Sequence, residues 1–463
     1  MSDPTGPARG RRTAPAVRGA LGGRIGPLEL LAVLVPLLTV AALAMVRPID
    51  DPSTTHPPTD VPLTRATLVC PTALPGTGTV ALANADGTEG DVTTRLPVEE
   101  TVALDGTSRT GVKRALVAQA EGELAAGFLG VRYGDAAALS CSAPQPEQWF
   151  TGVGAGPEHS STLELVNPDR GPAVADVTVL GPDGLMEVPA LRGVTVPGGR
   201  TMRFELADIV PTRDELALHV QVSRGRLGVD VVDQVDELGR GARSRDWLPS
   251  QNEAGTTAYL LGLGGKPGDR TLVLANPGDS EARVRLRVIT KESEFAPADA
   301  DEIRVAPGST ETVDLTELLQ SRAAQGALGV RLDATRPVTA ALRTVAGGDL
   351  SHAVAGVRIE ARAALAMPRG PSRLVLSGAD GVGVATYVVT DEDGKEIARE
   401  RVELTPGVAA RLNLPREGAV VDLMVERSGV VAALEVGPPG LAVLPLPELV
   451  LGGRVPDVRP ALR

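Results

Sequence analysis

The chain has 463 residues, a formal net charge of −12 and an aromatic content of only 2%. This length exceeds what one hydrophobic core usually holds, so several folding units are expected. The acidic balance excludes nucleic acid as an expected partner, and the scarcity of aromatic side chains argues against stacking platforms for sugars or bases.

The N-terminal segment predicts a membrane anchor. Residues 1–26 carry five arginines against a single acidic residue, Asp3, and residues 27–46 form an apolar run. This run is close to the ~20 residues of a spanning helix, and basic flanks stay in the cytoplasm. We therefore expect a single-pass protein of the cell membrane with an extracytoplasmic C-terminal region. The alternative is secretion after cleavage near Ala44, because residues 42–44 read Ala-Leu-Ala.

A stalk and a disulfide are expected next. Residues 47–64 are rich in proline and threonine and are typical of an extended linker. Cys70 and Cys141 are the only cysteines of the chain. Outside the cytoplasm such a pair favours a structural disulfide, which would close the first of the repeats described next.

One β pattern recurs four times after the stalk. A short apolar strand that ends in Asn or Gly appears at residues 79–84, 162–167, 271–276 and 373–378. In the later copies a Pro-Gly pair follows about 30 residues further on, at residues 197–198, 307–308 and 406–407, whereas the first copy has Asp105-Gly106 near this place. Each copy then ends in two strands around a turn, which in the third copy are expected at residues 327–332 and 338–344. Helix is expected only near residues 206–209 and 314–322.

These strand lengths and turns predict an all-β fold of tandem β-sandwich repeats of the immunoglobulin or fibronectin type. The predicted repeats cover residues 65–145, 146–245, 246–362 and 363–445, followed by a Pro-rich tail at residues 446–463. A β-propeller is the alternative, and each repeat would then supply two blades.

Residues with the usual chemistry of active sites are sparse. The four histidines (His56, His159, His219 and His352) show no metal-ligand spacing, and no nucleophile, zinc or phosphate-loop motif is present. We therefore expect no catalytic residues, no metal and no cofactor. The acidic cluster at residues 391–394 fits a hairpin turn better than a calcium loop, because the later ligand positions do not follow.

Trp149 and Trp247 are the only tryptophans, and each stands just before a predicted repeat begins. Equivalent positions at two boundaries favour contacts between neighbouring repeats. An exposed contact with a sugar or a partner is the alternative.

The order of these parts resembles a family of actinobacterial membrane-anchored extracytoplasmic proteins of unknown function. The features that carry the resemblance are the basic leader, the apolar span, Cys70-Pro71 with Ser140-Cys141-Ser142, Trp149 and the Leu-x-Asn-Pro repeats. The resemblance implies no catalytic residues. It implies gene neighbours among envelope glycosyltransferases, and hence a link to a glycosyltransferase system.

The sequence therefore predicts a non-catalytic accessory or interaction protein of the bacterial cell envelope. Its expected partner is another envelope protein or a cell-wall polymer. Two alternatives stay open: an enzyme that processes cell-wall glycan or peptide, and a passive spacer or adhesin stalk. A surface cleft with two close carboxylates would favour the enzyme, and a row of separate domains would favour the spacer.

Overall fold

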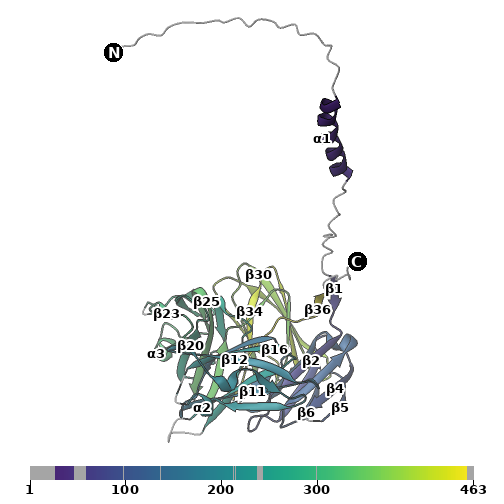
Figure 1. Ribbon diagram of the computed structural model, residues 1–463. Coiled ribbons are helices and arrows are strands. Elements are labelled where there is room, and N and C mark those ends of the chain that lie inside the picture. Colours follow the sequence, from purple (N-terminus) through teal and green to yellow (C-terminus); the bar gives the residue numbers. More distant parts are fainter. Residues whose placement is uncertain are drawn as a thin grey trace, which may run out of the picture. The chain divides into compact units, whose positions relative to one another are not determined.

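The computed structural model describes residues 27–45, 59–96, 98–135, 137–211, 213, 215–236, 243–298, 300–438 and 440–455 (Figure 1). The chain divides into two compact units, Met1–Thr59 with Val455–Arg463, and Asp60–Arg454. In the first unit, helix α1 (Pro27–Met45) forms over the predicted apolar run. No helix among the described residues combines the length and the hydropathy needed to cross a bilayer. The predicted leader, most of the stalk and the end of the Pro-rich tail lie outside the described residues.

The second unit, which we call the body, is built from antiparallel sheets. Its two ends meet in a small sheet of β1 (Thr59–Pro62) and β36 (Gly452–Val455). Between them lie four groups of strands, which we call repeats 1 to 4: β2–β9, β10–β18, β19–β26 and β27–β35. The strands of each repeat divide between a first and a second sheet, and in repeat 3 one long strand joins the two. The all-β prediction is confirmed.

Repeat 1 shows the arrangement. Its first sheet has the order β2 (Arg65–Cys70), β7 (Leu116–Glu121), β4 (Gly90–Leu96), β5 (Glu100–Leu104). Its second sheet has the order β6 (Ser108–Gly111), β3 (Thr79–Asn84), β8 (Phe128–Tyr133), β9 (Ala138–Ser140), and a 3-10 turn covers Gly122–Ala125. The chain crosses between the sheets several times, and both contribute to one hydrophobic cluster that includes Leu68, Leu116, Val80 and Phe128.

Repeat 2 follows the same plan. The first sheet contains β10 (Glu147–Val153), β16 (Leu216–Arg224), β12 (Ala173–Gly181), β13 (Gly184–Met186) and β14 (Val194–Val196). The second contains β15 (Thr201–Glu205), β11 (His159–Val166), β17 (Gly228–Val235) and β18 (Ser244–Leu248). A 3-10 turn covers Pro189–Leu191, and helix α2 (Leu206–Ile209) is the single turn that the sequence predicts.

Repeat 3 differs because one long strand serves both sheets. Two separate strands were expected near residues 327–332 and 338–344, but β25 runs unbroken over Gly329–Ala346. Its first half pairs with β19 (Gly255–Leu261) and β21 (Ala282–Ile289), which extends to β22 (Glu294–Phe295) and β23 (Ile303–Val305). Its second half pairs with β20 (Asp269–Ala275) and β26 (Asp349–Val354), and β24 (Thr310–Asp314) pairs with β20. Helix α3 (Thr316–Gln320) is shorter than predicted.

Repeat 4 returns to two sheets. The first has the order β28 (Arg362–Ala366), β33 (Val420–Glu426), β30 (Gly383–Thr390), β31 (Glu396–Leu404). The second contains β32 (Ala410–Leu414), β29 (Ser372–Ser377), β34 (Val430–Val436), β35 (Ala442–Pro445) and the short β27 (Arg358–Ile359). Residues 391–394 form the predicted hairpin turn between β30 and β31, where Gly394 has a φ of 74°.

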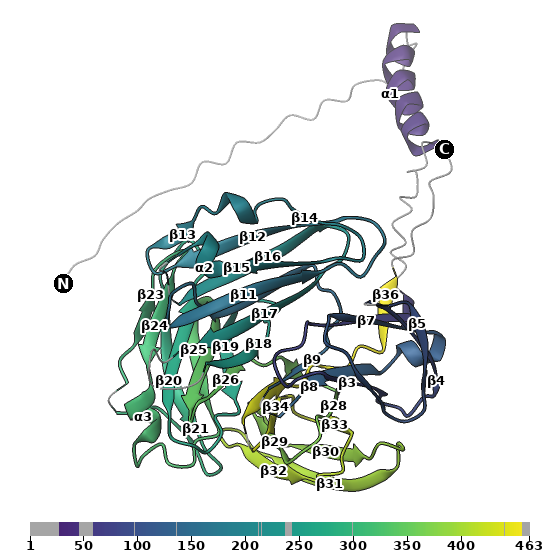
Figure 2. The same cartoon turned by 90° about the horizontal axis from the view of Figure 1, so that it is seen from below.

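The repeats close a ring. The first sheet of each repeat contacts the second sheet of the next one, through β2 with β17, β10 with β20 and β25, and β19 with β29 and β34. Strand β28 of repeat 4 contacts β3 and β8 of repeat 1, and Figure 2 shows these strands side by side. The closing strands β9, β18, β26 and β35 also contact one another around the ring. Ring closure is shared with the propeller alternative, although a propeller blade uses consecutive strands and these sheets interleave.

Ring closure explains the burial pattern. Strand β21 alternates in the usual way, with Ala282, Val284 and Leu286 buried and Arg283 and Arg285 exposed. The second-sheet strand β3 is instead buried at five successive positions. One face of β3 packs on its own first sheet and the other on repeat 4, so apolar residues are required on both faces.

The recurring asparagine makes the same contacts in repeats 2 and 3. Asn276 is fully buried, and its Nδ2 donates to Ser280 O at 2.8 Å and to Val305 O at 3.1 Å, while its Oδ1 accepts from Gly278 N at 2.9 Å. Asn167 makes the same contacts with Gly171, Val196 and Asp169. The side chain therefore joins the turn after the apolar strand to the strand before the Pro-Gly pair. This contact explains their fixed separation in sequence.

Replacing Asn276 by alanine is expected to lower the free energy of unfolding by about 1–3 kcal/mol, because buried backbone groups lose their partners. Urea unfolding followed by circular dichroism measures this change. The matched control is Asn413→Ala at an exposed position of β32. Equal effects of the two substitutions would contradict the role given to Asn276.

Candidate functional site

The predicted disulfide is present. Cys70 at the end of β2 and Cys141 after β9 are bonded, with their Cα atoms 4.4 Å apart, and both residues are buried. Beside the bond, Val69 and Ser142 form a β bridge. The disulfide thus joins the opening and closing strands of repeat 1, and its role is structural.

Both tryptophans are buried at junctions between repeats. Trp149 is 5% exposed, stacks on His219 with ring centroids 3.9 Å apart, and shares a hydrophobic cluster with Ala275 of repeat 3. Trp247 is 1% exposed and shares a cluster with Leu74 and Leu139 of repeat 1. Neither ring offers a free face to a ligand.

A buried polar network occupies the junction of repeats 2 and 3. Ser161 Oγ donates to Asp233 Oδ1 at 2.5 Å, and His159 Nε2 lies 2.9 Å from the same oxygen. The three residue types are those of a hydrolase triad, but the serine contacts the aspartate rather than the histidine, and all three side chains are buried. A nucleophilic serine needs the histidine as its base and a path for substrate. This network is therefore structural.

The network extends into repeat 3. Arg343 Nη2 donates to Glu215 Oε1 at 2.6 Å, and its Nη1 lies 2.7 Å from His159 Nδ1. His352 Nε2 lies 3.2 Å from Asp233 Oδ2. Burial opposes the charge on His159, but the carboxylates of Asp233 and Glu215 outweigh burial and Arg343, and they raise its pKa to about 9. Charged groups from both repeats therefore hold this junction together.

Stability is expected to fall between pH 7 and pH 10. The folded pKa of His159, about 9, lies above the ordinary value of 6.5. Its contribution, up to about 3 kcal/mol, is thus complete below pH 6.5 and is lost as the pH rises through 9. Thermal unfolding from pH 6 to pH 10 should show this fall, and His159→Gln should reduce it. Parallel profiles for the two proteins would contradict the assignment.

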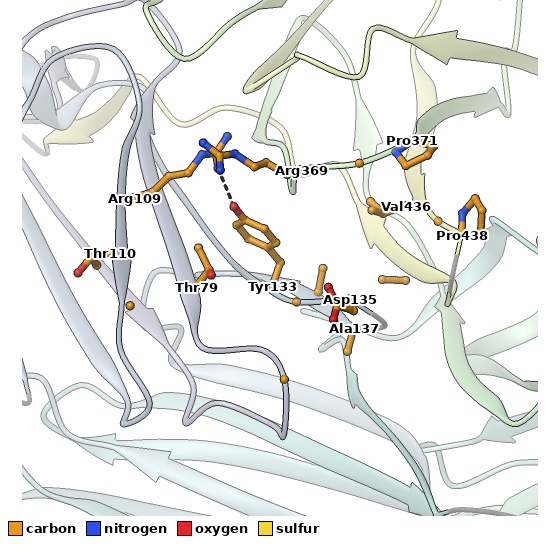
Figure 3. A pocket seen from close by; sticks show the side chains of 17 residues that line it. Thr79, Arg109, Thr110, Tyr133, Asp135, Ala137, Arg369, Pro371, Val436 and Pro438 are labelled. Carbon is orange, nitrogen blue, oxygen red and sulfur yellow. Dashed lines mark hydrogen bonds between the residues drawn. The ribbon is translucent and has the colours of Figure 1, made fainter.

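A hollow with a volume of about 600 Å³ lies between repeats 1 and 4 of the body (Figure 3). Arg109 on β6 donates from Nη1 to Tyr133 Oη at 3.1 Å and from Nε to Glu392 Oε1 at 3.1 Å. Arg369 makes a bidentate pair with Glu392, at 2.8 and 2.9 Å. Two guanidinium groups thus share one carboxylate at the edge of this hollow, and a second carboxylate, that of Asp135, lies in its lining.

Few titratable groups lie at this first hollow among the described residues. Burial raises the pKa of Glu392, but Arg369 and Arg109 outweigh it and hold that pKa below its ordinary value, so the group is a poor proton donor near neutral pH. Asp135 is the only carboxylate among the described lining residues, and no histidine, cysteine or serine lines the hollow. Among the described residues, no group of three or more His, Cys, Asp or Glu side chains is placed to hold a metal.

Sequence reasoning missed the residues of this hollow. Arg109 and Glu392 are 283 positions apart, and only ring closure brings them together. Glu392 was considered only within the acidic cluster at residues 391–394, as part of a hairpin turn or of a calcium loop. The only hint of this site in the sequence was the arginine at position 109 inside a predicted β region. Such an arginine indicates a carboxylate partner, but the sequence does not show which residue supplies it.

A protein-family model matches residues 70–415 of the chain, from the first cysteine to the residue after β32. The model describes a family of unknown function. No curated protein matches the chain. The match includes both cysteines and both tryptophans and covers most of the sequence. The expected membership of a family of unknown function is thereby confirmed, and the chain belongs to the DUF5719 family.

Proposed function

We propose that this protein is a non-catalytic accessory protein of the bacterial cell envelope, which works outside the cytoplasm and binds an envelope component at the first hollow. The single observation that carries the proposal is the composition of that hollow: two arginines share the carboxylate of Glu392, and the described lining residues include one carboxylate, Asp135, and no histidine, cysteine or serine. Such a site is suited to recognise a polar ligand, and the threonine and tyrosine hydroxyls have no histidine among the described lining residues to act as their base.

The extracytoplasmic location rests on two observations. A buried disulfide is typical of oxidising compartments. The basic leader and the apolar run over residues 27–46 are typical of export with a retained anchor, as in the actinobacterial family that the order of parts resembles. Membrane extraction with alkaline carbonate, together with mass spectrometry of the mature N-terminus, separates a retained anchor from cleavage near Ala44.

We propose that each repeat is a β-sandwich of the immunoglobulin or fibronectin type, and that the ring makes the four repeats one rigid binding platform. The shared cluster of the two sheets in repeat 1 supports the first part, and the contacts between repeats support the second. Four repeats closed into a ring extend over a shorter distance than the same four repeats in a row. This argues against a passive spacer.

Crosslinking in intact membranes followed by affinity capture tests the function. The expected result is one stoichiometric envelope partner, whose capture weakens in Arg369→Ala and persists in Arg401→Ala at an exposed position of β31. Turnover of purified cell-wall material by the protein, with no captured partner, would replace this proposal by the enzyme alternative.

A further inference from the structure

Two acidic side chains of repeat 2 are buried where this repeat meets repeat 1. Glu164 on β11 and Asp230 on β17 are 1% and 5% exposed. They are direct partners in the antiparallel register of the two strands. Their side chains therefore project from the same face of the sheet, with Cβ atoms about 5 Å apart. Leu163 and Leu165 point into the core of repeat 2, so the acidic pair points the other way, toward repeat 1.

Contacts across the junction show how closely repeat 1 covers this face. Thr72 of repeat 1 donates from its backbone N–H to Glu164 Oε1 at 2.7 Å. Val166, on the same face of β11, shares a hydrophobic cluster with Val69 of repeat 1. Gly228, on the same face of β17, lies so near Val69 that a Cβ atom would come within 2.4 Å of it. The acidic pair is thus enclosed between two repeats.

One oxygen of each carboxyl group has no hydrogen-bond partner among the described residues. These atoms are Glu164 Oε2 and Asp230 Oδ2, and both are buried. A buried carboxylate oxygen without a donor is costly, and two ionised carboxylates on facing positions repel each other. A single proton shared by the two groups removes both costs, because the protonated group then donates to the ionised one.

The arginines around the pair agree with one proton and one negative charge. Arg132 on β8 of repeat 1 is fully buried, and its Nη atoms donate to the carbonyl oxygens of Val112 and Arg114. Its positive charge attracts both carboxyl groups. Arg203 on β15 lies 3.8 Å from Glu164 Oε2, but it is 45% exposed and water screens its charge. One buried guanidinium group therefore balances one of the two carboxylates.

Asp230 is the member of the pair that keeps the proton. Burial and the charge of Glu164 raise the pKa of Asp230 well above its ordinary value, and the attraction of Arg132 does not offset them. Glu164 instead has the Thr72 amide as a donor, which favours its ionised form. Other charged groups on and near the packed strands have partners of their own: His159 with Asp233 at 2.9 Å, Glu147 with His219 at 2.6 Å, Asp169 with Arg226 at 2.6 Å, Arg65 with Glu121 at 2.9 Å, Arg245 with Gln234 at 2.6 Å, and Asp246 with the backbone N–H of Trp247 at 2.8 Å.

We propose that Glu164 and Asp230 share one proton and form a pH switch at the junction of repeats 1 and 2. While the proton is held, the pair closes the junction; once it is lost, two buried negative charges face each other and the junction loosens. An exposed aspartate releases its proton at about pH 4. The opened junction is therefore increasingly favoured as the pH rises above about 4, until the closed form has lost the proton as well.

Hydrogen exchange of the Thr72 amide in the full chain tests this switch, because that amide donates to Glu164 across the junction. Wild type and Asp230→Asn are compared at each pH from 4 to 8, so the intrinsic exchange rate cancels. The asparagine amide donates to Glu164 without titrating. The ratio of the wild-type rate to the variant rate is expected to grow about tenfold per pH unit above pH 4, until the folded pKa of Asp230 is passed. Asp279→Asn, at an exposed turn, should give a ratio that does not change with pH.

Urea unfolding at pH 8 supplies a second test that does not depend on Asp230→Asn alone. Glu164→Gln also places a permanent donor in the pair, so each single variant should have a higher urea midpoint than wild type. The double variant should gain no more than the better single variant, because only one proton position is to be filled. A Thr72 exchange ratio that stays constant from pH 4 to pH 8 would overturn the switch. Additive gains from the two substitutions would also overturn it, since they would show that the carboxyl groups act independently.

Discussion

Replacing Asp233 by alanine is expected to lower the free energy of unfolding by about 3–5 kcal/mol, because it leaves buried partners without their counter-charge. Asp233 is fully buried, and His159, His352 and Ser161 surround its carboxylate. Burial raises the pKa of Asp233, but His159 and His352 outweigh burial, and the net shift is strongly downward. The stabilisation from this carboxylate is therefore present above pH 4 and is lost on acidification.

Two variants separate the charge of Asp233 from its volume. Asp233→Asn keeps an acceptor and the size of the side chain, so it should recover part of the loss. Asp279→Ala is the matched surface control, because Asp279 is exposed in the turn after β20. Urea unfolding at pH 7 measures all three. A loss for Asp233→Ala within 1 kcal/mol of the control would show that the junction does not depend on this carboxylate.

The recurring strands were predictable because their signals are local. The four apolar strands ending in Asn or Gly, the Pro-Gly turns and the turn of α2 all appear near the expected positions. The asparagine contacts of repeats 2 and 3 give the physical reason, since each joins segments 29 residues apart, as Asn276 does with Val305. The break expected between residues 332 and 338 was wrong, because β25 passes from one sheet to the other without a turn.

The ring was not predicted as the leading arrangement because its closure depends on long-range contacts. The clue was present in the second-sheet strands: residues 271–275 read Thr-Leu-Val-Leu-Ala without alternation. An antiparallel sheet with one solvated face alternates, whereas a sheet covered on both faces is apolar throughout. Such runs in every repeat indicate neighbours on both sides, which four separate sandwiches do not supply.

The residues of the candidate site likewise fall into those that the sequence indicated and those that it did not. Cys70, Cys141 and the two tryptophans were singled out because their types are rare in this chain, and rarity needs no knowledge of the fold. Arginine is common in this sequence, so Arg369 carried no distinguishing signal, and Arg109 indicated only that an acidic partner lies somewhere in the chain. The significance of both residues comes from the carboxylate of Glu392 that they share in the folded chain.

The disulfide between Cys70 and Cys141 closes a loop of 71 residues that contains nearly all of repeat 1. In the chain-entropy description, a cross-link restricts the unfolded chain, and the restriction grows slowly with loop length. A loop of this size corresponds to about 4 kcal/mol at most. Repeat 1 also carries the contact with repeat 4 that closes the ring, so its loosening should be transmitted to the whole body.

The double substitution Cys70→Ala with Cys141→Ala is therefore expected to lower the free energy of unfolding by about 2–4 kcal/mol. Wild-type protein in excess dithiothreitol should unfold at nearly the same urea concentration as this variant. The same reductant should leave the variant itself unchanged, which separates loss of the bond from other effects of the reagent. A body that unfolds alike with and without the bond would show that contacts within the ring, and not the cross-link, limit the opening of repeat 1.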